Sequence, residues 1–262
     1  SYTGGHYSMH AAFSWSRLSS YDNGGLKDVE DLKSSLASED IPVNLNAMTG
    51  YRYLSGYLHN QYAISKEREY HDSIEVIEDG RRVKRDTIKV EYIPLMTFSH
   101  IFETNNSNRR YIEKTANQGF YDTTYYDNSK TNDTTDVLTI RNTLAVTFCE
   151  EYNTKLKFGV TAFAMNECQR FMNDSVPYDS IYDYRWTNNT FVGGAIHKHS
   201  GSIVHYNVEG KVCVLGYKIG EFDVNGRLET KFKAGKYPMI IGARAYAKSE
   251  KPSRYLQHFR SN

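Results

Sequence analysis

The chain has 262 residues, and its 32 basic and 31 acidic residues leave a formal net charge of +1. This balance argues against nucleic acid as a partner, because no unopposed basic surface is available. The mean hydropathy of −0.64 excludes a helical membrane protein, since no stretch approaches the roughly 20 consecutive apolar residues of a spanning helix. A transmembrane barrel is not excluded, because its strands present an apolar side chain to lipid only at every second residue.

The composition also favours strands at a membrane boundary. Tyrosine dominates the aromatic residues, with 22 Tyr and 12 Phe against 2 Trp. Tyr is favoured in strands and in the aromatic belts where a barrel meets the lipid headgroups. The 5 prolines lie mostly outside the clearest strand patterns, as a hydrogen-bonded sheet requires.

Nine strands are predicted along the chain, and long polar segments separate several of them. In chain order, the strands cover residues 6–18, 51–65, 88–103, 137–150, 155–172, 189–198, 203–216, 221–233 and 238–248. The longer polar segments cover 19–49, with a candidate short helix at 26–36, then 66–86, 104–136 and 173–188. The segment 66–86 has turn residues at 78–80 and predicts a small hairpin.

The alternation of side chains is clearest in the strands predicted at 203–216 and 221–233. Val208, Val212 and Leu228 belong to the apolar set, whereas Glu209 and Arg227 belong to the polar set. A period of two indicates extended strands whose two faces meet different surroundings. The Asn-Gly pair at 225–226 would also suit a hairpin turn, but the alternation continues through it. We therefore predict an all-β, antiparallel transmembrane β-barrel with lipid outside and a charged, wet lumen inside.

The candidate pore-lining residues share a place on the polar face of a predicted strand, where charged rings would set the ion preference of a lumen. They are Arg141, Lys155, Lys157, His205, Glu209, Lys211, Arg227, Glu229, Lys231, Lys233, Arg244 and Lys248. The same alternation would occur on the solvated face of a soluble sheet. A second layer of protein over the apolar set would therefore contradict the membrane interpretation.

Other chemistry is weakly represented. His197 and His199 would share one strand face, but no Cys, Asp or Glu close in sequence completes a metal site. The three cysteines, Cys149, Cys168 and Cys213, are widely spaced and indicate isolated thiols. No nucleophile elbow or ordered triad occurs. We expect no metal, no cofactor and no enzymatic activity.

Four segments of strand and turn residues, at 93–100, 191–196, 215–226 and 254–262, together resemble the putative porin family of Bacteroidota outer membranes. The likeness covers most of the chain and carries no catalytic residues. It implies a location in the cell outer membrane and passive diffusion of small hydrophilic solutes. It also implies a longer barrel, of which residues 1–262 would be a single region, incomplete at both ends.

Two other functions stay open from the sequence. One is an outer-membrane barrel that acts as a binding or scaffold component for partner proteins or glycans, to which the Tyr-, Asn- and Thr-rich segment 104–136 is suited. The other is a soluble carbohydrate-binding β-sandwich. For the barrel, we expect contacts with outer-membrane lipid or lipopolysaccharide, with other outer-membrane proteins and with small hydrophilic solutes, and none with nucleic acid.

Overall fold

The computed structural model describes residues 1–3, 6–33, 35–78, 81–115, 119–121, 123, 127–151, 157–173, 183–199, 203–253 and 256. This part of the chain forms one antiparallel sheet of ten strands, which are neighbours in the same order as in the sequence. The strands are β1 (Tyr2–Thr3), β2 (Tyr7–Asp22), β3 (Ala47–Glu78), β4 (Arg81–Glu113), β5 (Thr131–Phe148), β6 (Gly159–Asn173), β7 (Asp183–Lys198), β8 (Val204–Gly216), β9 (Phe222–Ala234) and β10 (Tyr237–Ser249). A 3-10 helix, η1 (Val29–Lys33), lies between β2 and β3. Among the described residues, no helix is long and apolar enough to cross a membrane.

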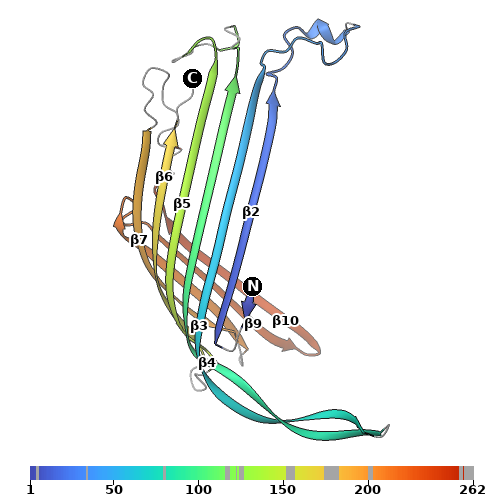
Figure 1. Cartoon of the computed structure of the whole chain (residues 1–262), viewed down its shortest axis with the longest axis vertical. Coiled ribbons are helices and arrows are strands. Elements are labelled where there is room, and N and C mark those ends of the chain that lie inside the picture. Colours follow the sequence, from blue (N-terminus) through green and yellow to red (C-terminus); the bar gives the residue numbers. More distant parts are fainter. Residues whose placement is uncertain are drawn as a thin grey trace.

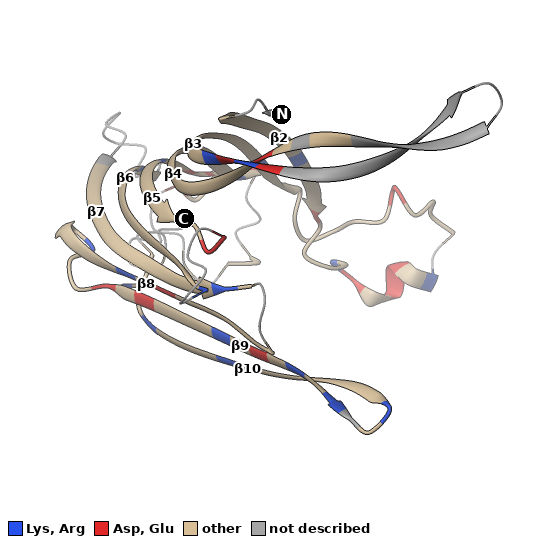
Figure 2. Ribbon diagram, turned by 90° about the horizontal axis from the view of Figure 1, so that it is seen from below, with Lys and Arg blue, Asp and Glu red and all other residues tan. Residues whose placement is uncertain are grey.

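The sheet curves strongly. The long strands β2–β7 stand side by side, and β8–β10 lean across the lower half of the molecule (Figure 1). Seen from below, the sheet follows an open arc, with β2–β4 on one side and β8–β10 on the other (Figure 2). A wide sheet bends in this way because each strand is twisted relative to its neighbour. We call the inside of the arc the concave face and the outside the convex face.

All nine predicted strands are present, and the predicted hairpin at 66–86 is confirmed as an extension of two of them. The second and third predicted strands were too short, because β3 and β4 stay paired out to Glu78 opposite Arg81. This hairpin extends below the rest of the sheet (Figure 1), and its turn residues 79–80 lie outside the described residues. Pro94 does not interrupt β4, because it pairs with Ser65 at a register shift, where a proline is tolerated.

Three predicted loops were too long. Both ends of the segment 104–136 are strand, since β4 continues to Glu113 and β5 begins at Thr131. The segment 19–49 contributes residues to β2 and β3, and only five residues of its predicted helix form η1. The segment 173–188 gives its last residues to β7. These stretches were predicted as loops because their side chains are polar. A strand that is paired on both sides nevertheless satisfies its backbone N–H and C=O groups, whatever the polarity of its side chains. The alternative turn at 225–226 is wrong, because β9 pairs with β10 through both residues.

The sheet has no second layer over the described residues. Of the residues that the structure describes, only Ala47, Phe171, Phe191 and Cys213 are buried hydrophobic residues, which is far too few for the core of a soluble domain of this size. Val208, Val212 and Leu228 are 47%, 40% and 48% exposed, so the apolar set is uncovered. A single sheet also contradicts the alternative of a soluble carbohydrate-binding β-sandwich, which would need two packed sheets. The wall of a barrel has this form, although the sheet is open between β2 and β10.

Candidate pore lining

A row of charges of alternating sign crosses the concave face. Glu103 on β4 is directly opposite Arg141 on β5, which is directly opposite Glu167 on β6. Residues that are directly opposite share a face and have Cβ atoms about 5 Å apart, so their charges interact. Arg141 Nε donates a hydrogen bond of 2.7 Å to Glu167 Oε2.

The turn between β8 and β9 brings a second cation to this carboxylate. Lys218 Nζ lies 2.9 Å from Glu167 Oε1, and its backbone N–H donates to Asn189 Oδ1 at 2.9 Å. The turn needs glycine at Gly216, where φ is 105° and an added Cβ would lie 2.0 Å from the carbonyl oxygen of Asn188. The Glu167 side chain is only 3% exposed, so its charge is almost fully surrounded by protein.

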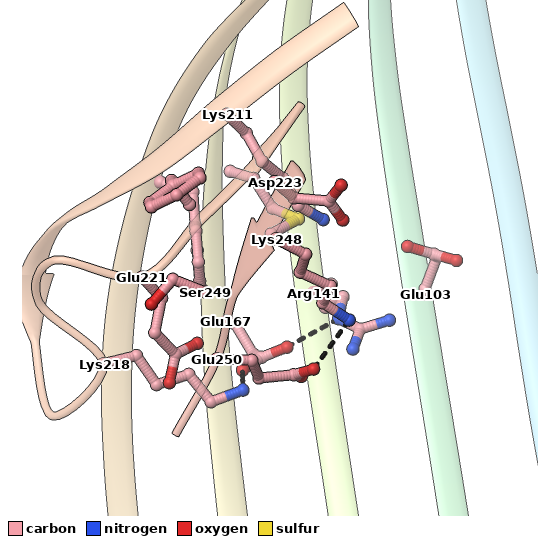
Figure 3. Close-up of a pocket in the computed structure, with 13 residues that line it drawn as sticks. Glu103, Arg141, Glu167, Lys211, Lys218, Glu221, Asp223, Lys248, Ser249 and Glu250 are labelled. Carbon is pink, nitrogen blue, oxygen red and sulfur yellow. Dashed lines mark hydrogen bonds and ion pairs between the residues drawn. The ribbon is translucent and has the colours of Figure 1, made fainter. Parts of the chain in front are cut away.

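A second alternating row lies on the part of the sheet that curves round to face the first. Lys211 on β8 is opposite Asp223 on β9, which is opposite Lys248 on β10. The two rows enclose a cavity of ≈ 230 Å³ with an opening to solvent. Arg141 and Lys218 converge on Glu167 within it, and Lys211, Asp223 and Lys248 lie beside them (Figure 3). Both signs of charge are thus concentrated on the concave side.

A third group of charges lies nearer the lower end of β8–β10. Arg227 and Arg244 are directly opposite each other, and Arg227 forms an ion pair with Glu229, which is opposite His205. A shallow cavity of ≈ 270 Å³ is lined by His205, Arg227, Glu229 and His199. Like charges directly opposite destabilise a sheet, and the Glu229 carboxylate offsets this repulsion.

Ten of the twelve candidate residues belong to strands and share the concave face by register: Arg141, His205, Glu209, Lys211, Arg227, Glu229, Lys231, Lys233, Arg244 and Lys248. Lys157 was assigned to the wrong element, because β6 begins at Gly159 and Lys157 lies before it with φ 48°. Lys155 lies outside the described residues.

The sequence patterns missed Glu103, Glu167 and Lys218. The two glutamates lie on strands whose concave faces also carry apolar residues, such as Ile101 on β4 and Met165 on β6, which hides the alternation. Lys218 lies in a turn, and its only signal is the pair of glycines at 216 and 220, both with positive φ.

The two histidines of the segment 197–199 lie close together. Their rings stack with centroids 5.4 Å apart. Within the described ranges, no three His, Cys, Asp or Glu side chains are grouped so that they could hold a metal ion.

Comparison with known proteins adds a family. Neither the curated proteins nor the solved structures contain a match to this chain. The family described as putative porin matches residues 1–262, the whole sequence. This match agrees with the single curved sheet and its charged inner surface. The chain belongs to the putative porin family.

Proposed function

We propose that this chain is part of an outer-membrane β-barrel through which small hydrophilic solutes diffuse passively. The observation that carries the proposal is the contrast between the two faces of one uncovered sheet. Charges of both signs gather on the concave face, whereas large apolar side chains stay exposed on the convex face. Such a sheet is stable where lipid covers the convex face and water fills the concave side.

The apolar part of the convex face has the length of a membrane crossing. On β2 it runs from Tyr7 through Phe13 to Trp15, which are 40%, 72% and 60% exposed. A tilted strand of about 9–11 residues spans the hydrocarbon, and the stretch 7–15 is of that length. Trp and Tyr at its ends suit the two boundaries with the headgroups.

The lower boundary is marked on three strands. Tyr7, Tyr62 and Phe98 are directly opposite one another on β2, β3 and β4 and form an exposed aromatic row. Below this row, past the register shift, the convex face continues with exposed Lys66 and Arg68. Charges are costly on the lipid face, so we place the β3–β4 hairpin in the aqueous space below the membrane.

The edges of the sheet support a larger barrel. On its outer side, β2 pairs only with the two residues of β1, and β10 has no further neighbour among the described strands. Backbone groups within hydrocarbon must be hydrogen-bonded inside the protein. We therefore propose that further strands close the barrel between β2 and β10.

The lumen proposed here is polar without a single dominant charge. Rows such as Glu103, Arg141 and Glu167 offer both donors and acceptors to ions and polar solutes. Passive passage needs no reaction, and we propose a non-enzymatic role.

Conductance of the full-length protein in a planar lipid bilayer tests this function. We expect steady, voltage-independent open channels with a current that scales with salt concentration. A protein that inserts but stays silent would refute the porin function and support the alternative of a binding or scaffold barrel. If channels open, polyethylene glycols of graded size, added to the chamber, give the width of the lumen.

A further inference from the structure

Three arginines lie together on the convex face near the upper end of the strands, where the long connections 23–46 and 114–130 emerge. They are Arg17 on β2, Arg52 on β3 and Arg110 on β4, and all three are exposed. The register places them on the face opposite to Glu103 and Arg141.

The arrangement of these arginines is unfavourable without a partner. Arg17 is directly opposite Arg52, and Arg110 is two residues from Asn108, the residue opposite Arg52. Directly opposite Cβ atoms are about 5 Å apart and diagonal ones about 7–8 Å, so the three guanidinium groups can reach one site. Like charges directly opposite destabilise a sheet.

No acidic side chain of the described residues forms an ion pair with these arginines. The convex positions of β2, of β3 over 48–64 and of β4 over 96–112 contain no Asp or Glu. Arg110 Nε donates only to the amide oxygen of Asn132, at 3.3 Å. The closest acid in the same row, Asp136, pairs with Arg170 at 2.9 Å. The contrast with Arg227 and Arg244 is direct, because Glu229 accompanies that pair.

The position of the three arginines identifies the chemistry of the missing partner. Trp15 and Leu54 are opposite each other on the same face, and the next convex position along each strand is Arg17 or Arg52. The cations therefore begin where the apolar band ends. Apart from the β3–β4 hairpin, the longer connections lie at this end of the strands. The longer loops of an outer-membrane barrel face outward, so we place this row at the outer leaflet. Anionic headgroups attract basic side chains at such a boundary, and phosphate accepts bidentate hydrogen bonds from arginine.

We propose that Arg17, Arg52 and Arg110 bind a phosphate group of an anionic glycolipid of the outer leaflet. This inference rests on the proposed outer-membrane barrel and adds a lipid site to it. Phosphate oxygens accept hydrogen bonds from the guanidinium groups, and the acyl chains lie along Phe13, Trp15 and Leu54.

The test uses the full-length protein in neutral detergent, with diphosphorylated lipid A as the probe. Each arginine beside an anionic headgroup contributes roughly five-fold in affinity, so Arg17→Gln with Arg52→Gln lowers the affinity roughly 30-fold. The matched control is Arg227→Gln with Arg244→Gln, which removes an opposed arginine pair from the concave face. We expect this control to bind lipid A as the wild type does. Binding is measured by native mass spectrometry and by the lipid-dependent rise in Tm.

Two further probes separate the sources of the phosphate. Lipid A without phosphates, and inorganic phosphate alone, are expected to give little binding. Equal binding of the dephosphorylated lipid, or unchanged binding by the Arg17/Arg52 variant, would overturn the lipid site. Conductance of the same preparations is measured in parallel. Open channels together with unchanged lipid A binding by the Arg17/Arg52 variant overturn only this inference, whereas a protein without channels overturns the proposed function instead.

Discussion

Replacing Glu167 with Gln removes a carboxylate that forms ion pairs with two cations on the concave face. Glu167 accepts from Arg141 at 2.7 Å and from Lys218 at 2.9 Å, and its side chain is 3% exposed. Gln keeps the shape but leaves both cations without their counter-charge. Loss of one partner of a buried ion pair costs about 3–5 kcal/mol.

The magnitude must be reduced because the cations are partly solvated. The Arg141 side chain is 37% exposed and that of Lys218 is 22% exposed, so water screens part of the lost interaction. We expect Glu167→Gln to lower the free energy of unfolding by about 2–3 kcal/mol. The assay is urea unfolding of the full-length protein in lipid vesicles, followed by tryptophan fluorescence.

The control is Glu209→Gln, on the same face. Glu209 is exposed and is opposite Asn225, so its replacement is expected to change stability by less than about 0.5 kcal/mol. A double-mutant cycle between Glu167→Gln and Lys218→Gln is expected to give a coupling energy of about 1–2 kcal/mol. If Glu167→Gln unfolds like the Glu209 control, the network contributes no stability and the reasoning fails.

Three further predictions follow from the turns and the charges. Gly216→Ala is expected to lower the free energy of unfolding by more than about 2 kcal/mol, because it combines positive φ with a backbone clash. The control Gly235→Ala has positive φ but meets open space, so it is expected to lose only about 1–2 kcal/mol. Equal losses in urea unfolding would contradict the clash. Replacing Arg227 and Arg244 by Gln is expected to shift the reversal potential in a salt gradient towards cation preference, and an unchanged potential would show that the pair does not face the permeating ions. Burial and the Glu151 carboxylate raise the pKa of the Cys149 thiol, so alkylation of the folded protein at pH 8 should be slower than in urea and should rise with pH; equal rates at pH 8 would contradict this.

The sequence predicts strands well where the two faces differ strongly. Along β8 and β9, apolar residues such as Val208 and Leu228 on one face alternate with charged residues such as Glu209 and Arg227 on the other. The predicted ends of both strands lie within one residue of the observed ends. Over 104–113 the contrast disappears, because Asn105 and its neighbours on both faces are polar. That stretch was therefore predicted as loop although it is strand.

The sites depend on register, which a single sequence does not reveal. Arg17 and Arg52 are 35 positions apart, and only the pairing of β2 with β3 shows that they are opposite. Glu167 and Lys218 meet because a glycine turn folds back over the sheet, which depends on backbone angles rather than on any periodic pattern. Faces can thus be predicted from alternation, whereas partners across strands require the structure.

Neighbouring residues on one strand can distinguish a sheet that spans a membrane from a sheet that water surrounds. Spin labels are placed at position 208 or 209 of the full-length protein in lipid vesicles, and their collision rates with oxygen and with a water-soluble nickel complex are measured. We expect the label at position 208 to collide mainly with oxygen dissolved in lipid, and the label at position 209 to collide mainly with nickel. Equal access of nickel to both positions would contradict a sheet with lipid on one face and water on the other.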